Sequence, residues 1–155
     1  MNNSTTNSSD AIAQQRDDFI DRFLGFASGT FSMFSIYIGD RLGLYRALSQ
    51  NGGSTPKELA AKTGTHARYI REWLEQQTVA GVLKVENPDD PATQRRFYLP
   101  EAAREVLADP ESIEFMAGTV QCVVGAAGPL DHIVDAYRTG AGVPFEAYGL
   151  SLIHI

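Results

Sequence analysis

The hydrophobic and polar residues between positions 55 and 64 predict a short helix with a well-defined start. Thr55 is a good N-cap residue, Pro56 suits the first helical position, and Glu58 stands three residues after the cap. This order is a capping box, in which the threonine hydroxyl and the glutamate carboxylate each accept a hydrogen bond from an otherwise free backbone N–H. Gly64 can adopt the positive φ that ends many helices, so a tight turn is predicted there.

A second helix and two strands are predicted directly after this turn. Thr65 is the expected N-cap of the helix, whose apolar residues share one face at spacings i, i+3 and i+4: Ile70, Trp73 and Leu74. Gly81 ends the helix, the apolar residues of 82–86 predict a strand, and 95–99 predict another after an acidic loop. Two helices joined by a tight turn and followed by a hairpin are typical of a winged helix-turn-helix.

Further helices are predicted on both sides of this motif. Apolar residues recur at helical spacing up to Ala27, a break is expected at 28–30, and a second helix is expected over 31–48. The helix over 31–48 is apolar on more than one side, which indicates a central position or a contact with a second chain. Its glycines, Gly39 and Gly43, would fit a close contact with another helix. After the hairpin, helices are predicted over 101–108, 111–127 and 130–140.

The pattern divides the chain into four parts. Residues 1–13 are mostly polar and bury too little to offset the entropy of ordering, so a disordered tail is expected. Residues 14–108 form the expected winged-helix domain, and 109–149 form a helical linker. Residues 150–155 resemble the read-through of a sequencing adapter and are expected to be a non-native end. The predicted fold class is mainly α: a winged helix-turn-helix with a short β-hairpin wing and flanking helices.

The composition narrows the classes of protein that fit this fold. Hydrophobic residues make up 43% of the chain, which is ordinary for a globular domain, and the formal net charge is -6. An acidic chain is a poor electrostatic match for a phosphate backbone. The one cysteine, Cys122, excludes an internal disulfide, and its apolar neighbours predict a buried thiol. Without a signal peptide or an apolar run of about 18 residues, we expect a cytoplasmic protein and no membrane contact.

The outer side of the second helix carries the side chains that would have to read DNA. A recognition helix places its N-terminal residues against base edges. Here basic and acidic residues are mixed on that side: His66, Arg68, Arg71, Glu72 and Glu75. The wing adds Arg95 and Arg96 near an acidic tip at Asp89 and Asp90. We interpret the arginines as exposed or paired with glutamates, so nucleic acid is not an expected partner. A winged-helix DNA-binding transcriptional regulator is the alternative.

Four stretches together resemble one family. They are LGLYRAL at 42–48, TPKELAAKTG at 55–64, REWLEQQ at 71–77 and GVPF at 142–145. The chain resembles the N-terminal winged-helix region of bacterial S-adenosylmethionine-dependent methyltransferases that act on small molecules. The resemblance implies that a Rossmann-like catalytic domain follows in the intact protein and transfers a methyl group to a small-molecule acceptor. It also implies a homodimer in which this region forms the dimer interface and caps the substrate cavity.

The cofactor motif of that family does not occur in the sequence. The family holds S-adenosylmethionine on a glycine-rich turn of the D-x-G-x-G type, whereas Gly52–Gly53 and Gly140–Gly142 follow no buried strand and are interpreted as turn glycines. We therefore expect a chain that is truncated before the catalytic domain and inactive alone, with no catalytic or cofactor-binding residues. S-adenosylmethionine is expected only in the intact protein. No metal site is expected, because the histidines share no ligand spacing: His66, His132 and His154.

A substrate-pocket contribution is expected from aromatic and thioether side chains. The resemblance implies that helices of this region close over the substrate, while an ordinary hydrophobic core is the alternative for each residue. Phe26, Met33 and Met116 are the candidate substrate-pocket residues, because each has a small neighbour that leaves room. The wider set from which they are taken is Phe23, Phe26, Phe31, Met33, Phe34, Tyr37, Phe115 and Met116.

Overall fold

A computed structural model of the chain describes residues 3–50 and 52–149. Its internal contacts divide it into two units, 1–32 and 33–155, and each is described by itself. Residues 150–155, expected to be a non-native end, lie outside the described residues. The described chain is mainly helical with one two-stranded antiparallel sheet, which confirms the predicted fold class.

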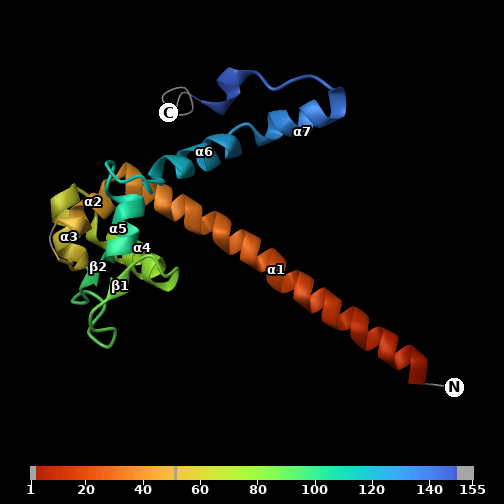
Figure 1. Cartoon of the computed structure of the whole chain (residues 1–155), viewed down its shortest axis with the longest axis horizontal. Helices are drawn as coiled ribbons and strands as arrows, with labels where there is room; N and C mark the ends of the chain where they lie inside the picture. The colour runs from red at the N-terminus through yellow and green to blue at the C-terminus, as the bar shows by residue number, and fades with distance from the viewer. Residues whose placement is uncertain (1–2, 51, 150–155) are drawn as a thin grey trace. The chain divides into compact units, whose positions relative to one another are not determined.

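Figure 1 shows α2, α3, α4 and α5 gathered around the small β1–β2 hairpin. The helices and strands have the following bounds: α1 Asn3–Arg41, α2 Leu44–Ser49, α3 Pro56–Thr63, α4 Ala67–Val79, β1 Lys84–Val85, β2 Phe97–Tyr98, α5 Glu101–Leu107, α6 Ala117–Ala127, α7 Leu130–Thr139, and the 3-10 turn η1 Phe145–Tyr148.

The N-terminal helix α1 is longer and more continuous than predicted. The break expected at 28–30 is wrong, because Thr30 stays helical and its hydroxyl donates to the carbonyl oxygen of Phe26 at 2.9 Å. The helix also begins at Asn3, where the sequence predicted a disordered tail over 1–13. Adding a residue to an existing helix costs far less than nucleating one, so the polar segment can extend the apolar helix behind it.

Helix α1 ends at Arg41, so the single helix expected over 31–48 is wrong. Gly43 adopts the left-handed conformation, with φ 66°, and serves as the N-cap of α2. An L side chain rarely takes this conformation, and the glycine therefore lets the chain turn between the two helices. The turn brings Tyr45 from α2 against the C-terminal part of α1.

The core lies where α2, α3 and α4 meet the hairpin. The capping box of α3 forms as predicted, with Glu58 N–H donating to the Thr55 hydroxyl at 3.3 Å and Thr55 N–H donating to the Glu58 carboxylate at 2.9 Å. The predicted inward face of α4 is confirmed, and the buried apolar residues around it are Leu44, Tyr45, Leu48, Leu59, Ala60, Ile70, Trp73, Leu74, Leu83, Phe97 and Ala108.

The N-cap of α4 is His66, and the predicted cap at Thr65 is wrong. His66 Nδ1 accepts a hydrogen bond from the backbone N–H of Arg68 at 3.3 Å. The Thr65 hydroxyl instead pairs with the Thr63 hydroxyl at 2.8 Å, across the turn. Because that side chain is used within the turn, the helix begins one residue later than the sequence predicts.

The wing is a short hairpin with an additional bridge that the sequence did not predict. Lys84 pairs with Tyr98 and Val85 with Phe97 in the antiparallel register. Ser54 forms an isolated bridge to Phe97 through two backbone hydrogen bonds of 2.8 and 3.0 Å. The bridge fixes the segment before α3 to the wing, although sequence patterning indicated only a turn there.

The segment after the wing is less well packed than predicted. Helix α6 begins at Ala117 rather than near Glu111, because the Asp109 and Ser112 side chains accept backbone N–H groups and favour turns over helix. Only Ala117 and Val120 of α6 are buried. The predicted buried thiol is therefore wrong, since Cys122 is exposed.

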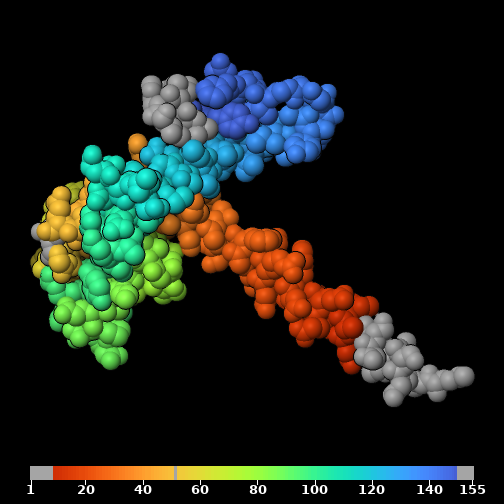
Figure 2. All heavy atoms as spheres, viewed as in Figure 1, coloured from red at the N-terminus to blue at the C-terminus, as the bar shows by residue number. Residues whose placement is uncertain are grey.

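Many large apolar side chains are exposed on α1, α6 and α7. Figure 2 shows the atoms of α1 as the red to orange part of the surface. None of the helices over the described residues is both long and apolar enough to cross a bilayer. The exposed apolar residues on these helices include Ile12, Phe19, Ile20, Phe23, Leu24, Phe26, Phe31, Ile38, Val123, Leu130, Val134 and Tyr137.

We predict that Gly39→Ala destabilises the fold by about 1–3 kcal/mol, because overpacking a closed contact forces its neighbours to shift. A Cβ at Gly39 would lie 2.5 Å from Trp73 Cζ2 and 2.6 Å from Tyr45 Cε2. Urea denaturation measures the free energy of unfolding. The matched control is Gly25→Ala in the same helix, where a Cβ meets nothing within 4 Å and no loss is expected. Equal stability of the Gly39→Ala and Gly25→Ala variants would contradict the close contact.

Candidate functional site

A buried glutamine connects α4 to both α1 and α2. Gln77 is fully buried, and its Oε1 accepts a hydrogen bond from the Tyr45 hydroxyl. Its Nε2 donates to Ser35 Oγ at 3.2 Å and to Gln76 Oε1 at 2.7 Å. Ser35 Oγ in turn donates to Gln76 Oε1 at 2.6 Å. A buried amide is costly unless its polar atoms are paired, and this network pairs both ends of the Gln77 side chain.

Trp73 extends the same junction. Its Nε1–H donates to the backbone carbonyl oxygen of Ser35 at 2.9 Å. Its ring meets Tyr45 edge-on, with centroids 5.2 Å apart and an interplanar angle of 62°. Gly39 lies under both rings and is the predicted glycine that permits close helix contact. The junction therefore orients the C-terminal turns of α1 on the winged helix.

Burial changes the acid–base behaviour of Tyr45. Loss of solvent raises the pKa of its phenol well above the ordinary value of 10.0, and the nearby Asp40 carboxylate adds to the shift. The hydroxyl therefore stays neutral in the folded state and keeps donating to Gln77.

The outer face of α4 and the wing is charged but largely paired. Arg71 pairs with Glu72, and Arg95 Nη1 donates to Glu75 Oε1 at 2.8 Å. These two pairs confirm, for Arg71 and Arg95, the interpretation that arginines on this face are exposed or paired with Glu72 and Glu75. The pairing lowers the net positive charge that α4 and the wing offer to a phosphate backbone.

The other wing arginine is also engaged. Arg96 Nη1 donates to Glu58 Oε2 at 3.0 Å, and Arg96 Nη2 donates to the carbonyl oxygen of Gly53 at 3.0 Å. The pKa of the Glu58 carboxyl is lowered, first by the backbone N–H of Thr55 and then by Arg96. Arg96 thus ties the wing to the start of α3.

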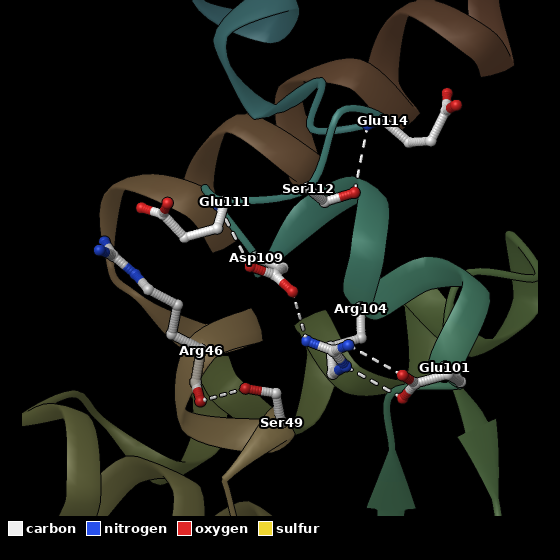
Figure 3. A network of polar contacts seen from close by, with 8 residues as sticks. All are labelled: Arg46, Ser49, Glu101, Arg104, Asp109, Glu111, Ser112 and Glu114. Carbon is white, nitrogen blue, oxygen red and sulfur yellow. Dashed lines mark hydrogen bonds and ion pairs between the residues drawn. The ribbon is translucent and has the colours of Figure 1, made fainter.

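A second polar network closes the end of α5 (Figure 3). The Arg104 guanidinium donates to both Glu101 carboxylate oxygens, at 2.8 and 3.0 Å, and to Asp109 Oδ2 at 2.8 Å. The Arg104 hydrogen bond is the largest cause that holds the pKa of Asp109 below its usual range. The fork holds the turn after α5, where Ala108 enters the core.

A groove of about 550 Å³ lies between the starts of α3 and α4 and the wing loop. The residues that line it are Pro56, Lys57, Ala67, Arg68, Arg71 and Thr93. Three of these are cationic and none is acidic. A smaller cavity of about 70 Å³ lies near the end of α5, lined by Asp40, Arg46, Leu107, Ala108, Pro110 and Phe115. The cationic groove had no counterpart in the sequence interpretation, because its walls come from three separate segments.

The three candidate substrate-pocket residues do not line either cavity. Phe26 lies in the first unit and is 65% exposed. Met33 is half-buried near the C-terminal end of α1, and Met116 is the N-cap of α6 and 55% exposed. Their role in a substrate pocket stays a prediction.

The predicted turn glycines adopt turn geometry. Gly52 and Gly53 have φ values of 61° and 105°, and Gly140 ends α7 with φ 73°. Gly53 also approaches the backbone of Phe97 closely, which suits the Ser54 bridge beside it. Within the described ranges no group of three or more His, Cys, Asp or Glu side chains could hold a metal ion.

The capped helix pair, the buried junction and the paired wing define a winged helix-turn-helix protein. The sequence model of one family, described as the Rv2258c-like winged HTH domain, matches residues 30–108. The chain therefore belongs to the Rv2258c-like winged helix-turn-helix family. No curated protein matches the sequence.

Several solved structures share the fold. Human N-acetylserotonin methyltransferase in complex with SAM aligns with TM-score 0.68 at 20% identity, covering 84% of this chain and 37% of that one. The riboflavin-derivative dimethyltransferase RosA from Streptomyces davawensis aligns with TM-score 0.63 at 25% identity, covering 87% and 36%. Mitomycin 7-O-methyltransferase MmcR aligns with TM-score 0.55 at 22% identity, covering 92% and 38%. The chain thus spans a little over a third of the length of these methyltransferases.

We predict that Tyr45→Phe lowers the free energy of unfolding by about 1–3 kcal/mol, because Gln77 Oε1 then loses its donor while buried. Urea denaturation measures the change. The matched control is Tyr69→Phe on the exposed side of α4, for which we expect less than about 0.5 kcal/mol. A Tyr45→Phe variant as stable as the control would contradict the buried network.

The same variant tests the pKa shift of Tyr45. The pKa of the Tyr45 phenol is higher in the folded state than in the unfolded state. The stabilisation of the fold by the neutral phenol is therefore complete below pH 10 and is lost as the pH rises beyond it. Between about pH 8 and about pH 11, the free energy of unfolding should therefore fall more in the native chain than in Tyr45→Phe. Parallel pH dependence of the two proteins would contradict the shift.

Proposed function

We propose that the chain is the N-terminal dimerisation and substrate-capping part of an S-adenosylmethionine-dependent methyltransferase that acts on a small molecule. The winged-helix family match and the shared fold with methyltransferases support the proposal. RosA is named as an N,N-8-amino-8-demethyl-D-riboflavin dimethyltransferase, and N-acetylserotonin methyltransferase was solved with SAM. The intact protein would use the same cofactor, act in the cytoplasm and methylate an acceptor of its own.

The exposed apolar face of α1 is the observation that carries the dimerisation role. Ile12, Phe19 and Phe26 recur every seven residues and are all exposed, as is Phe23 beside them. Apolar residues at this spacing form one stripe along a helix, and contiguous exposed apolar surface of this kind marks an association site. A second copy of the chain presents the same stripe, so a symmetric contact would cover both.

The winged helix acts in this proposal as a scaffold for that contact. Its buried junction holds the C-terminal turns of α1, while Arg71 and Arg95 pair with glutamates, which lowers the net positive charge of this face. The mixed charge of this face favours the methyltransferase proposal over a DNA-binding regulator.

The domain organisation belongs to the same proposal. Residues 14–108 would form the dimerisation domain, and 109–149 would lead toward the catalytic domain. Phe26, Met33 and Met116 would contribute apolar walls above the acceptor. A capping domain of this kind contributes to rate by holding the acceptor in line with the cofactor and by excluding water.

We predict that the chain self-associates at high micromolar concentration and that Phe19→Ser with Phe23→Ser abolishes the association. Removing two exposed phenylalanines from the stripe takes away apolar area that only the dimer would bury. Analytical ultracentrifugation distinguishes the species. The matched control is Tyr69→Ser, an exposed aromatic on α4, which should leave association unchanged. A monomeric native chain would contradict the proposal.

We predict that the 155-residue chain gives no saturable calorimetric signal with S-adenosylmethionine, because it carries no D-x-G-x-G turn. Sequencing the gene beyond position 149 provides the complementary test. A downstream strand followed by D-x-G-x-G supports the methyltransferase, whereas saturable binding to the present chain would contradict the assignment of the cofactor to a following domain.

A further inference from the structure

The groove between α3, α4 and the wing loop differs in charge from the rest of the protein. The chain has a formal net charge of -6, yet three cationic side chains line this groove: Lys57, Arg68 and Arg71. Its remaining walls are Pro56, Ala67 and Thr93, and no carboxylate lines it. The concentration of positive charge at one hollow of an acidic surface calls for an anionic occupant.

Two of the three cations are available to a ligand. Among the described residues, Lys57 has no ion pair. Arg71 pairs with Glu72, and the charge of Arg68 also helps to lower the pKa of the Glu72 carboxyl, without a hydrogen bond between the two. Both wing arginines, by contrast, are paired with glutamates outside the groove. Charge-assisted hydrogen bonds from Lys57 and Arg68 to a ligand could therefore form without breaking a hydrogen-bonded ion pair of the fold.

The backbone adds to this charge. Lys57 stands in the first turn of α3 and Arg68 in the first turn of α4. Thr55 and His66 already accept the N–H groups of Glu58 and Arg68, and the remaining partial positive charge of the two helix N-termini favours an anion beside them. The two helix starts meet at one groove because the Gly64 turn folds α4 back onto α3.

The size and the apolar walls of the groove define the remainder of the ligand. A volume of about 550 Å³ falls within the range of small-molecule sites. Proline, alanine and the methylene stems of lysine and arginine pack on flat apolar groups, and a guanidinium also stacks on aromatic rings. We propose that this groove binds a small organic dianion with a flat apolar body.

The surroundings favour a small molecule over a nucleic acid. Thr93 comes from the wing loop whose tip carries Asp89 and Asp90, both exposed. These carboxylates repel a phosphate backbone that continues past the groove, but they do not line the groove itself. The site is independent of the α1 stripe, so its test does not depend on dimerisation.

Naphthalene-2,6-disulfonate is a suitable probe, and isothermal titration calorimetry with the full 155-residue chain measures its binding. The test variant is Lys57→Gln with Arg68→Gln, which removes the two available cations but keeps polar side chains. The matched control is Lys84→Gln with Arg22→Gln, which removes the same net charge outside the groove. Thermal melting confirms that both double variants remain folded.

We expect the probe to bind the native chain and the control with the same affinity, and the test variant at least about tenfold more weakly, because charge-assisted hydrogen bonds are lost. The neutral analogue 2,6-bis(hydroxymethyl)naphthalene should not bind. Equal affinity of the test and control variants would overturn the site, as would equal binding of the neutral analogue. If duplex DNA binds more tightly than the probe, and the Lys57→Gln, Arg68→Gln variant loses that binding, the groove is a nucleic-acid site and the small-molecule proposal is overturned.

Discussion

The close packing of Trp73 and Tyr45 on Gly39 is the contact on which the rest of the fold depends. It works only because position 39 has no Cβ, and because the ring nitrogen and the phenol both find partners, in Ser35 and Gln77. One helix end is thereby held on the winged helix by apolar contact and by directional hydrogen bonds together. The direction of the α1 C-terminus is therefore set by α4.

This arrangement uses only the last turns of α1 for packing within the chain. The phenylalanines nearer the N-terminus, such as Phe19 and Phe23, stay exposed although they repeat at helical spacing. A helix with a stripe of exposed apolar side chains and burial only at one end has the surface that the proposed contact with a second copy would cover.

Charge on the winged helix is distributed in two distinct ways. Arg95 and Arg96 form ion pairs with Glu75 and Glu58, and these pairs hold the wing on the helices. Lys57 and Arg68 lie beside two helix starts and face a hollow without a carboxylate. The same motif thus combines ion-paired arginines on the wing with one groove that is lined by three cationic side chains.

The sequence alone determined the capping box at Thr55, the inward face of α4 and the winged-helix class, because these depend on local spacing and hydrogen bonding. It also indicated close contact at Gly39, but gave no way to name the rings that meet there. Local reasoning failed at Gly43, Thr65 and Cys122, where a left-handed turn, a competing hydroxyl pair and missing neighbours decided the outcome. The Ser54 bridge, the Gln77 network and the cationic groove join residues far apart in the chain. Only tertiary structure could decide them, since no periodicity within one segment records which distant segment will pack against it.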